Sequence, residues 1–351
     1  MPDLPIFDDF LPADKAAWEA QLTKEKTSSE QLQHQTSEGL TLEALYTRQE
    51  LSHTPTQQLA NQTLNEQMPA LGARHWYNQP IITVSDPKQA NADALEALAQ
   101  GADAVLFDLR EETPDWATLT KDILFDYCRI SFRISPEQDA NAILPSILDL
   151  GVKAGSFLTT TPELDHLHQA RDGFRTLVLT TTQSTDADRI ADLLLQVKQW
   201  ADVCPPERVW ASTEIALTMT HDYFGNLTLL RALRFLLSQM AHQYGLSTES
   251  LPVHVFTGQA AVSLPPADTH WMLSNTGQAM AAILGGAAAL TVIPHVEESR
   301  LAQRVARNVS NVLKEESYFD KVADPVAGAY YIEQRTDQLA RAAWQGFQER
   351  L

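Results

Sequence analysis

Three side chains are placed where they could do chemistry, because each follows a short apolar run typical of a buried strand. They are Asp108, His221 and His295. A carboxylate in such a place can act as a base or orient a ligand, and an imidazole can contact an anion or transfer a proton near neutral pH. The competing interpretations are a helix cap or turn for Asp108 and plain surface for the histidines. We keep Asp108 and His221 as the candidate catalytic residues.

The other residues that follow the apolar runs are mostly hydroxyl-bearing and nearly free of charge. They are Ser85, Asp86, Ser135, Thr159 to Thr161, Thr180 to Thr182, Gln183, Thr218, Thr220, Thr257, Gln259 and Pro294. This set contains no carboxylate pair with a spacing typical of acid–base catalysis, no metal-ligand cluster and no Ser/His/Asp or Cys/His arrangement. The sequence therefore predicts no complete catalytic set and no metal site.

Apolar runs and helical patterns alternate along most of the chain. The runs are Ile81–Val84, Ala104–Phe107, Ile130–Ile134, Gly155–Leu158, Thr176–Leu179, Val209–Leu217, Val253–Phe256 and Ala289–Ile293. The helical patterns include Ala90–Gln100, Ala140–Leu150, Ala187–Trp200, Leu227–His242, Gly277–Leu284 and Leu301–Lys314. Eight such repeats predict a (β/α)8 TIM barrel of the α/β class, whereas a doubly wound sheet more often stops at about five or six strands. The carboxyl ends of the strands would then bring the candidate residues to one face of the barrel.

The first part of the chain does not follow this alternation. A helix over Ala13–Thr23 would place Trp18 and Leu22 on one side, and Leu40 and Leu42 alternate as in a strand. We therefore predict an N-terminal helical and extended arm over residues 1–78 and the barrel domain over residues 79–351.

The charge balance limits the possible partners. The chain has 26 basic and 45 acidic residues and a net charge of −19, which argues against nucleic acid and anionic membranes as partners. Cys128 and Cys204 lie far apart, so no disulfide framework or zinc site is indicated. The apolar stretch Ala279–Pro294 is shorter than a membrane helix, and the first ten residues lack a signal-peptide pattern. We expect a cytoplasmic protein.

The C-terminal segment combines three structural signals. Val305, Val309 and Leu313 recur at helical spacing, and Asp324-Pro325 then breaks the helical pattern. Tyr330–Ile332 is apolar enough for a buried extended segment. Thr336 would then be the N-cap of a closing helix.

The same segment carries a resemblance to a known family. The matching residues are Arg307-Asn308, Glu315-Glu316-Ser317, Val322-Ala323-Asp324-Pro325, Gly328, Tyr330-Tyr331, Glu333, Thr336-Asp337 and Leu339. They resemble the end of the barrel domain of methylmalonyl-CoA mutases and related acyl-CoA mutases. Further matches precede the barrel, namely Phe7, Phe10, Trp18, Glu38-Gly39 and Leu45-Tyr46-Thr47. The resemblance covers nearly the whole chain and implies the same barrel.

The chain departs from the catalytic members of this family at the residues that contact substrate and cofactor. The Tyr-His pair at the end of their fifth strand is replaced within Leu177–Ser184, and their Arg-Gly-Pro-Tyr segment is absent from Gln67–Trp76. Their cobalamin-binding domain, with its Asp-x-His-x-x-Gly motif, would follow the barrel, but this chain ends at Leu351. The nearest decoy, Asp165–His168, has the wrong spacing. We expect no C-terminal cobalamin-binding domain.

Two further matches provide the candidate cofactor-binding residues. Arg231 and Arg234 resemble the Arg-Ala-x-Arg core of a mutase helix that lies near the coenzyme A path in catalytic subunits, and arginine is suited to phosphate. Gly285 and Gly286 match a glycine pair near the corrin, although alanines follow where catalytic subunits have polar residues. The alternative for the arginines is pairing with acids or covering apolar surface.

The resemblance and the departures together predict a non-catalytic small subunit of a methylmalonyl-CoA mutase. It would form a heterodimer with the catalytic large subunit, which would bind the adenosylcobalamin of the complex. One alternative is a barrel that binds acyl-CoA and works with a cobalamin domain on a separate chain. Another is a stand-alone acyl-CoA-binding or chaperone-like protein.

Overall fold

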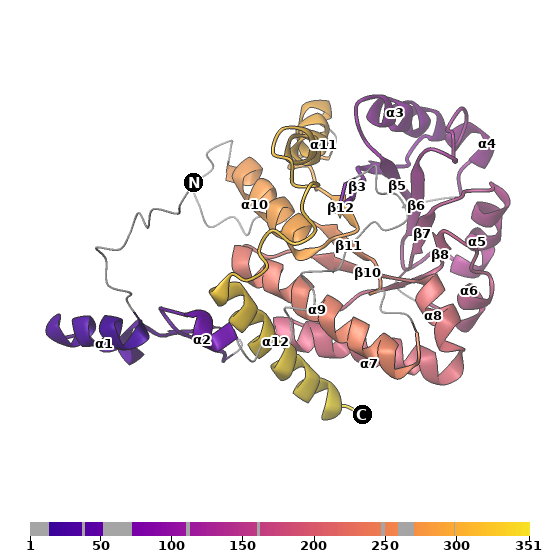
Figure 1. Ribbon diagram of the computed structural model, residues 1–351. Coiled ribbons are helices and arrows are strands. Elements are labelled where there is room, and N and C mark those ends of the chain that lie inside the picture. Colours follow the sequence, from indigo (N-terminus) through magenta and orange to yellow (C-terminus); the bar gives the residue numbers. More distant parts are fainter. Residues whose placement is uncertain are drawn as a thin grey trace, which may run out of the picture.

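The strands of the protein close into a parallel barrel surrounded by helices (Figure 1). This computed structural model describes residues 14–36, 39–51, 72–109, 113–159, 162–246, 250–258, 270–297 and 299–351. The family matches at Phe7, Phe10 and Glu38, and the strand-end residue Gln259, lie outside the described residues.

The ring consists of two five-stranded parallel sheets. They are joined at two places, where one sheet's edge strand continues almost directly into an edge strand of the other sheet. One sheet has the order β3-β12-β11-β10-β9 and the other β4-β5-β6-β7-β8. The strands are β3 (Tyr77–Asn78), β4 (Ile81–Thr83), β5 (Ala104–Leu109), β6 (Arg129–Ile134), β7 (Gly155–Leu158), β8 (Phe174–Arg175), β9 (Leu177–Leu179), β10 (Thr213–Thr218), β11 (Val253–Phe256) and β12 (Ala289–Thr291). Only Gln79 and Pro80 separate β3 from β4, and only Thr176 separates β8 from β9. Each of these pairs is therefore one strand position, and the expected (β/α)8 barrel is confirmed.

The first strand position is where the ring closes. The Gln79 N–H donates to the Leu290 carbonyl (3.0 Å), and the Pro80 carbonyl accepts from the Leu106 N–H (2.9 Å). Proline has no N–H to donate, so the chain leaves one hydrogen-bonding ladder at this point and enters the other. Because β3 pairs with β12, Tyr77 and Asn78 belong to the barrel sheet. The division of the chain at residue 78 stays a prediction.

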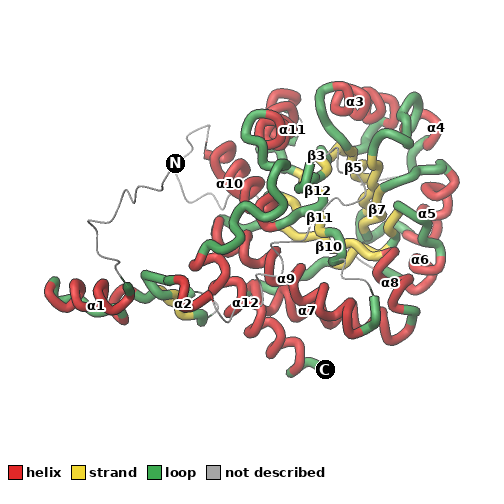
Figure 2. Tube along the Cα trace, viewed as in Figure 1, coloured by secondary structure: helices red, strands yellow, loops and turns green. Residues whose placement is uncertain are grey.

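Helices cover the outside of the ring (Figure 2). They are α3 (Pro87–Ala99), α4 (Trp116–Leu119), α5 (Ala140–Asp149), α6 (Leu164–His168), α7 (Asp186–Val203), α8 (Pro206–Ser212), α9 (Tyr223–Gln243), α10 (His270–Gly285), α11 (Arg300–Glu315) and α12 (Tyr330–Gln348). Several begin at an acidic or hydroxyl N-cap whose side chain accepts a backbone N–H, as Asp86, Thr185 and Ser299 do. No helix in these ranges is long and apolar enough to cross a membrane.

The expected arm precedes the barrel and projects from it in Figure 1. It contains α1 (Lys15–Lys24), a short antiparallel pair of β1 (His34–Gln35) and β2 (Thr41–Leu42), and α2 (Arg48–Leu51). Lys15 forms ion pairs with Glu43 and Glu50, which fixes α1 to the rest of the arm. Gln334 of α12 donates to the Glu50 carbonyl and so ties the arm to the barrel domain.

Two sequence-based assignments were wrong. The apolar run from Val209 to Leu217 begins as α8, which starts at a proline pair, and the strand begins only at Thr213. Tyr330–Ile332 is the first turn of α12 and not an extended segment, and the Thr336 hydroxyl donates to the Ile332 carbonyl (2.7 Å) inside that helix. The buried positions Ile332, Thr336, Leu339, Ala343 and Phe347 show why, because their helical spacing continues back through the aromatic run.

Two neighbouring strands of the ring, β6 and β7, lie very close together at Gly155. A Cβ built on Gly155 would lie 1.7 Å from the Ile130 carbonyl oxygen, whereas one built on Gly277 in α10 meets nothing within 4 Å. We expect Gly155→Ala to lower the free energy of unfolding by about 3 kcal/mol, because the strand backbone must move. Gly277→Ala should raise it by up to about 1 kcal/mol through helix propensity. Urea denaturation measures both, and equal effects would contradict the packing of β6 against β7.

Candidate functional site

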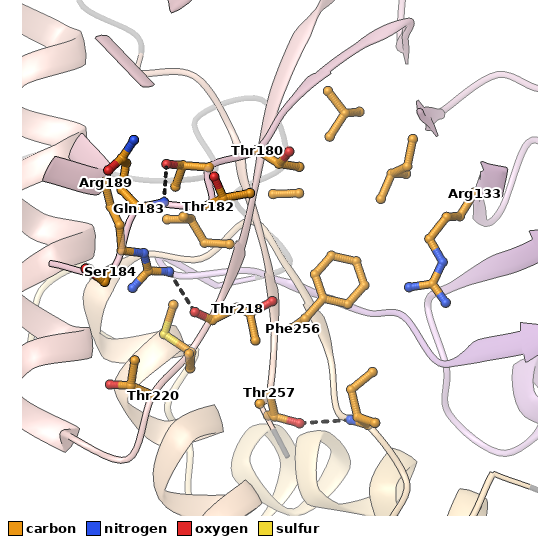
Figure 3. A pocket seen from close by; sticks show the side chains of 18 of the residues that line it. Arg133, Thr180, Thr182, Gln183, Ser184, Arg189, Thr218, Thr220, Phe256 and Thr257 are labelled. Carbon is orange, nitrogen blue, oxygen red and sulfur yellow. Dashed lines mark hydrogen bonds between the residues drawn. The ribbon is translucent and has the colours of Figure 1, made fainter. Parts of the chain in front are cut away.

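A pocket of about 660 Å³ opens at the carboxyl ends of the barrel strands (Figure 3). Its described lining comes mainly from β6, β7, β9, β10 and β11 and the residues that follow them. The polar members are Arg133, Thr159, Thr180, Thr181, Thr182, Gln183, Ser184, Arg189, Thr218, Thr220 and Thr257. The hydroxyl-rich character expected of this face is therefore present, and hydrophobic side chains such as Leu158 and Phe256 form the remainder.

Several of these polar groups already serve the loops around the pocket. The Thr257 hydroxyl accepts the Ile293 N–H (2.9 Å), as the dashed line in Figure 3 shows. The Thr220 hydroxyl lies 3.1 Å from the Asn226 side-chain oxygen, which also accepts the Thr220 N–H (3.0 Å). These bonds fix the strand-to-helix connections, so part of the hydroxyl lining shapes the pocket and is not free for a ligand.

Arg133 joins Asp108 to the wall of the pocket. Its Nε and Nη2 atoms donate to the two Asp108 carboxylate oxygens at 2.9 and 2.7 Å. Asp108 is 3% exposed and does not line the pocket. A carboxylate held by two guanidinium bonds is stabilised in its charged form and is a poor proton acceptor. Asp108 therefore orients Arg133, and its candidacy as a base stays a prediction that this geometry does not support.

The second cation of the pocket, Arg189, comes from α7. One guanidinium nitrogen donates to the Thr218 carbonyl (2.7 Å) and another to the Asp186 carboxylate (3.1 Å). The sequence reasoning missed both arginines because it considered only residues after the strands. Arg133 lies one position before the end of β6, on the same inward-facing side as Arg129 and Ser131, and the two-residue period of a strand could have indicated it.

The two histidine candidates lie outside the pocket lining. His221 is exposed, and its Nδ1 atom lies 3.2 Å from the Ser274 hydroxyl. His295 is exposed and stacks on Trp271, with ring centroids 5.6 Å apart. The described residues that line the pocket include no Asp, Glu, His, Cys or Lys. Among these residues, arginine is the only charged type, which suits binding of an anion better than proton transfer.

The barrel axis below the pocket is filled in two layers. The upper layer is apolar and contains Leu106, Leu158, Val178, Ala216 and Phe256. The lower layer is polar, and its main interaction is the buried ion pair between an Arg129 Nη2 and the Glu214 carboxylate. Side chains therefore close the floor of the pocket.

His254 belongs to the same lower layer. Its Nε2 atom lies 2.8 Å from the Thr291 hydroxyl, which in turn donates to the Gln79 carbonyl (2.6 Å). The Thr291 hydrogen is thus used, so His254 Nε2 carries the proton in this tautomer. Burial lowers the pKa of His254 to about 3, although the Glu214 charge opposes the shift.

The four cofactor candidates come together, but away from the pocket. Arg231 and Arg234 lie on α9, and Gly285 and Gly286 lie where α10 leads into β12. The Arg231 guanidinium is fully buried and pairs with Asp324 and, at 2.8 Å, with Glu333. This is the acid pairing that the sequence analysis kept as the alternative for the arginines.

The glycine pair makes room for α9 side chains. A Cβ on Gly285 would lie 2.8 Å from Leu230 Cβ, and one on Gly286 would lie 2.4 Å from an Arg234 nitrogen, so the lack of a side chain lets α9 and α10 approach. The space beside both glycines is thus already occupied by this chain, and these residues do not fit a corrin. Their cofactor role stays a prediction that the packing does not support.

Removal of the Arg231 guanidinium alone should destabilise the protein. Arg231→Met removes the guanidinium that pairs with the buried Asp324 and Glu333 carboxylates, so we expect the free energy of unfolding to fall by about 3–5 kcal/mol. Arg341→Met is the control, because Arg341 pairs with Asp337 at the surface and such pairs contribute about 1 kcal/mol or less. Adding Asp324→Asn and Glu333→Gln to Arg231→Met should restore part of the loss. Chemical denaturation that ranks the two methionine variants equally would contradict this assignment.

His254 should make the stability depend on pH. Its ordinary pKa is 6.5 in the unfolded chain and about 3 in the folded protein, so the unfolded state binds the proton first as the pH falls. Stability is therefore full above pH 6.5 and is lost as the pH falls towards 3, with about 2 kcal/mol lost at pH 5. His254→Gln should lose that much less between pH 7.5 and 5. Burial also lowers the pKa values of His75 and His166, but both residues are present in the wild type and in the variant. Parallel pH curves would therefore show that His254 does not contribute.

The sequence and the structure were both similar to those of known proteins. A family model described as methylmalonyl-CoA mutase matches residues 211–350. The methylmalonyl-CoA mutase small subunit of Porphyromonas gingivalis is 24% identical over 97% of this chain, and that of Streptomyces virginiae is 38% identical over 41%. The chain spans 63% and 24% of the lengths of these two relatives. Among solved structures, dihydropteroate synthase from Yersinia pestis matches with a TM-score of 0.40 and 15% identity, over 68% of this chain and 94% of that chain. Residues 211–350 thus match the methylmalonyl-CoA mutase family, and the small-subunit relative from Porphyromonas gingivalis is similar over nearly the whole chain.

Proposed function

We propose that this chain acts as a small, non-catalytic subunit of a heteromeric, cytoplasmic methylmalonyl-CoA mutase. The complex would interconvert methylmalonyl-CoA and succinyl-CoA, and the catalytic large subunit would carry out the reaction. The observation that carries the proposal is the similarity to a small subunit over 97% of this chain. In this role the barrel supplies a folded partner surface and not a reaction centre.

The charges at the barrel mouth support a non-catalytic role. Arg133 and Arg189 are the charged residues among the described pocket lining, and both already contact groups of their own chain. Catalysis requires groups that bind the transition state more strongly than the substrate. For this purpose the described lining residues offer hydroxyls and two constrained guanidinium groups, and none of them is an Asp, Glu, His, Cys or Lys.

The cofactor of the complex would be adenosylcobalamin held by the large subunit, where it supplies radical chemistry. On this chain the space beside Gly285 and Gly286 is taken by Leu230 and Arg234. The corresponding surface therefore packs one helix against another. This arrangement supports binding of the cofactor on the partner.

One observation favours a second candidate function. The mouth pocket has a volume of about 660 Å³, which lies within the range of small-molecule sites, and its described charged lining consists of two arginines, each paired with an aspartate of this chain. A barrel that binds acyl-CoA and works with a cobalamin domain on a separate chain would use such a pocket. That protein would bind acyl-CoA without a large subunit.

Co-expression with a large mutase subunit tests the main proposal. We expect a stable one-to-one complex by native mass, with all cobalamin following the large subunit when the two are separated. Each chain purified alone is the control. If this chain stays alone and binds acyl-CoA or cobalamin by itself, the non-catalytic role is wrong.

Substitutions on this chain test the same proposal by activity. His221→Ala and Asp108→Asn should leave kcat of the complex within about twofold, because neither side chain lines the pocket, whereas removal of a catalytic acid or base costs about 10²-fold or more. Thermal melting of each variant complex shows whether it is still folded. A folded variant complex with a large loss of kcat would show that the substituted residue takes part in catalysis.

A further inference from the structure

A second cavity lies on the outside of the barrel, where helices α3 and α11 meet. It measures about 310 Å³ and is lined by residues of α3 and α11. These helices are remote in sequence and become neighbours because the ring closes between β12 and β3, as Figure 1 shows. We call this cavity the seam groove. It is separate from the mouth pocket and shares no lining residue with it.

The two walls of the seam groove carry opposite charges. Arg300, Arg304 and Arg307 of α11 form one wall, and Asp93 and Glu96 of α3 form the other. The spacing of four and three residues places the arginines along one face of α11. Across the described ranges Arg300 and Arg304 form no ion pair, although both line the same cavity as the two acids. The charges therefore face one another across a space large enough to hold a ligand.

The lower end of the seam groove is firmly built. Arg307 is 8% exposed and donates to the Gln100 side-chain oxygen, and the Asn311 side chain donates to the Gln100 carbonyl (3.1 Å). Asn78 of β3 donates to the Arg307 carbonyl (3.2 Å). These bonds fix α11 to α3 and to the sheet below Arg304, so the floor of the groove is rigid.

The upper end of the seam groove is open and electropositive. Arg300 and Arg304 are exposed, and Arg300 is the first residue of α11 after the N-cap Ser299. The N-terminus of a helix of 16 residues adds its partial positive charge to the two guanidinium groups. The positive charge of these two guanidinium groups is local, since the whole chain carries a net charge of −19.

We propose that the seam groove binds a phosphate ester of a polyol. Arg300 and Arg304 contact the phosphate oxygens, for which the planar guanidinium is well suited. Asp93 and Glu96 accept hydrogen bonds from the hydroxyl groups of the same molecule. The acidic wall excludes a bare polyanion as the best ligand, because it would repel any charge placed against it. The cavity volume is at the lower end of the range for small-molecule sites and accommodates a pentose phosphate.

Calorimetric titration of the full chain with ribose 5-phosphate and with inorganic phosphate tests the proposal. Wild type should bind ribose 5-phosphate more tightly than inorganic phosphate. Arg300→Gln with Arg304→Gln should weaken ribose 5-phosphate by about tenfold or more, because the charge-assisted bonds are lost. The control with the same change in net charge is Arg208→Gln with Arg341→Gln, two exposed arginines on other helices, which should bind as wild type does.

The acidic wall gives an independent readout. Asp93→Asn with Glu96→Gln should tighten inorganic phosphate, because a repulsion is removed, and should reduce the preference for ribose 5-phosphate. Circular dichroism confirms that each variant is folded. Absence of ribose 5-phosphate binding at millimolar concentration, or equal losses in the two arginine double variants, would overturn the proposal. Equal affinity of wild type for both ligands would show an adventitious anion site only.

Discussion

The buried Arg231 guanidinium holds together three parts of the chain that the barrel sheet does not connect. It reaches from α9 to Asp324, in the connection after α11, and to Glu333 in α12. Nearby, Arg74 donates to the Ile283 and Leu284 carbonyls at the end of α10 at 2.6 and 3.1 Å, so a second buried arginine fastens the entry to the barrel against the same helix pair. Buried ion pairs are costly to desolvate, and hydrophobic residues of similar volume are often equally or more stabilising. An ion pair nevertheless requires its partners at a defined distance and orientation. The junction therefore determines where α12 and the last connection lie more than it adds to net stability.

Two acidic side chains in the described interior of the barrel are each paired with an arginine. Asp108 and Arg133 neutralise each other at the pocket wall, and Arg129 and Glu214 do so below the apolar layer. Both acids lie on inward-facing strand positions, where an unpaired carboxylate would have a raised pKa and could accept a proton. Pairing lowers the pKa of the Glu214 carboxyl through the Arg129 charge despite complete burial. Paired in this way, the two acids hold the positions of Arg133 and Arg129 in the barrel interior.

Sequence reasoning succeeded where the relevant interactions are local. The strand and helix periods are set by neighbouring residues, so the alternation that predicts the barrel could be read directly, and most expected strands were found within a few positions. The long-range features were not predictable in the same way. The partners of Arg231 lie 93 and 102 residues further along the chain, and only the fold shows which of several acids it contacts. The error at Tyr330–Ile332 has a related cause, because aromatic residues suit a strand until the helical spacing of the following buried positions is taken into account.

The break at Gln79 and Pro80 divides the barrel into two halves of nearly continuous sequence. β4 to β8 come from residues 81–175, and β9 to β12 come from residues 177–291, with β3 added at the edge. The hydrophobic clusters between sheet and helices follow the same division, since one spans residues 82–174 and the other is built almost entirely from residues 167–347, with Trp76 added. Each half-barrel thus has its own ladder and its own core. Such halves are natural units of cooperative local unfolding.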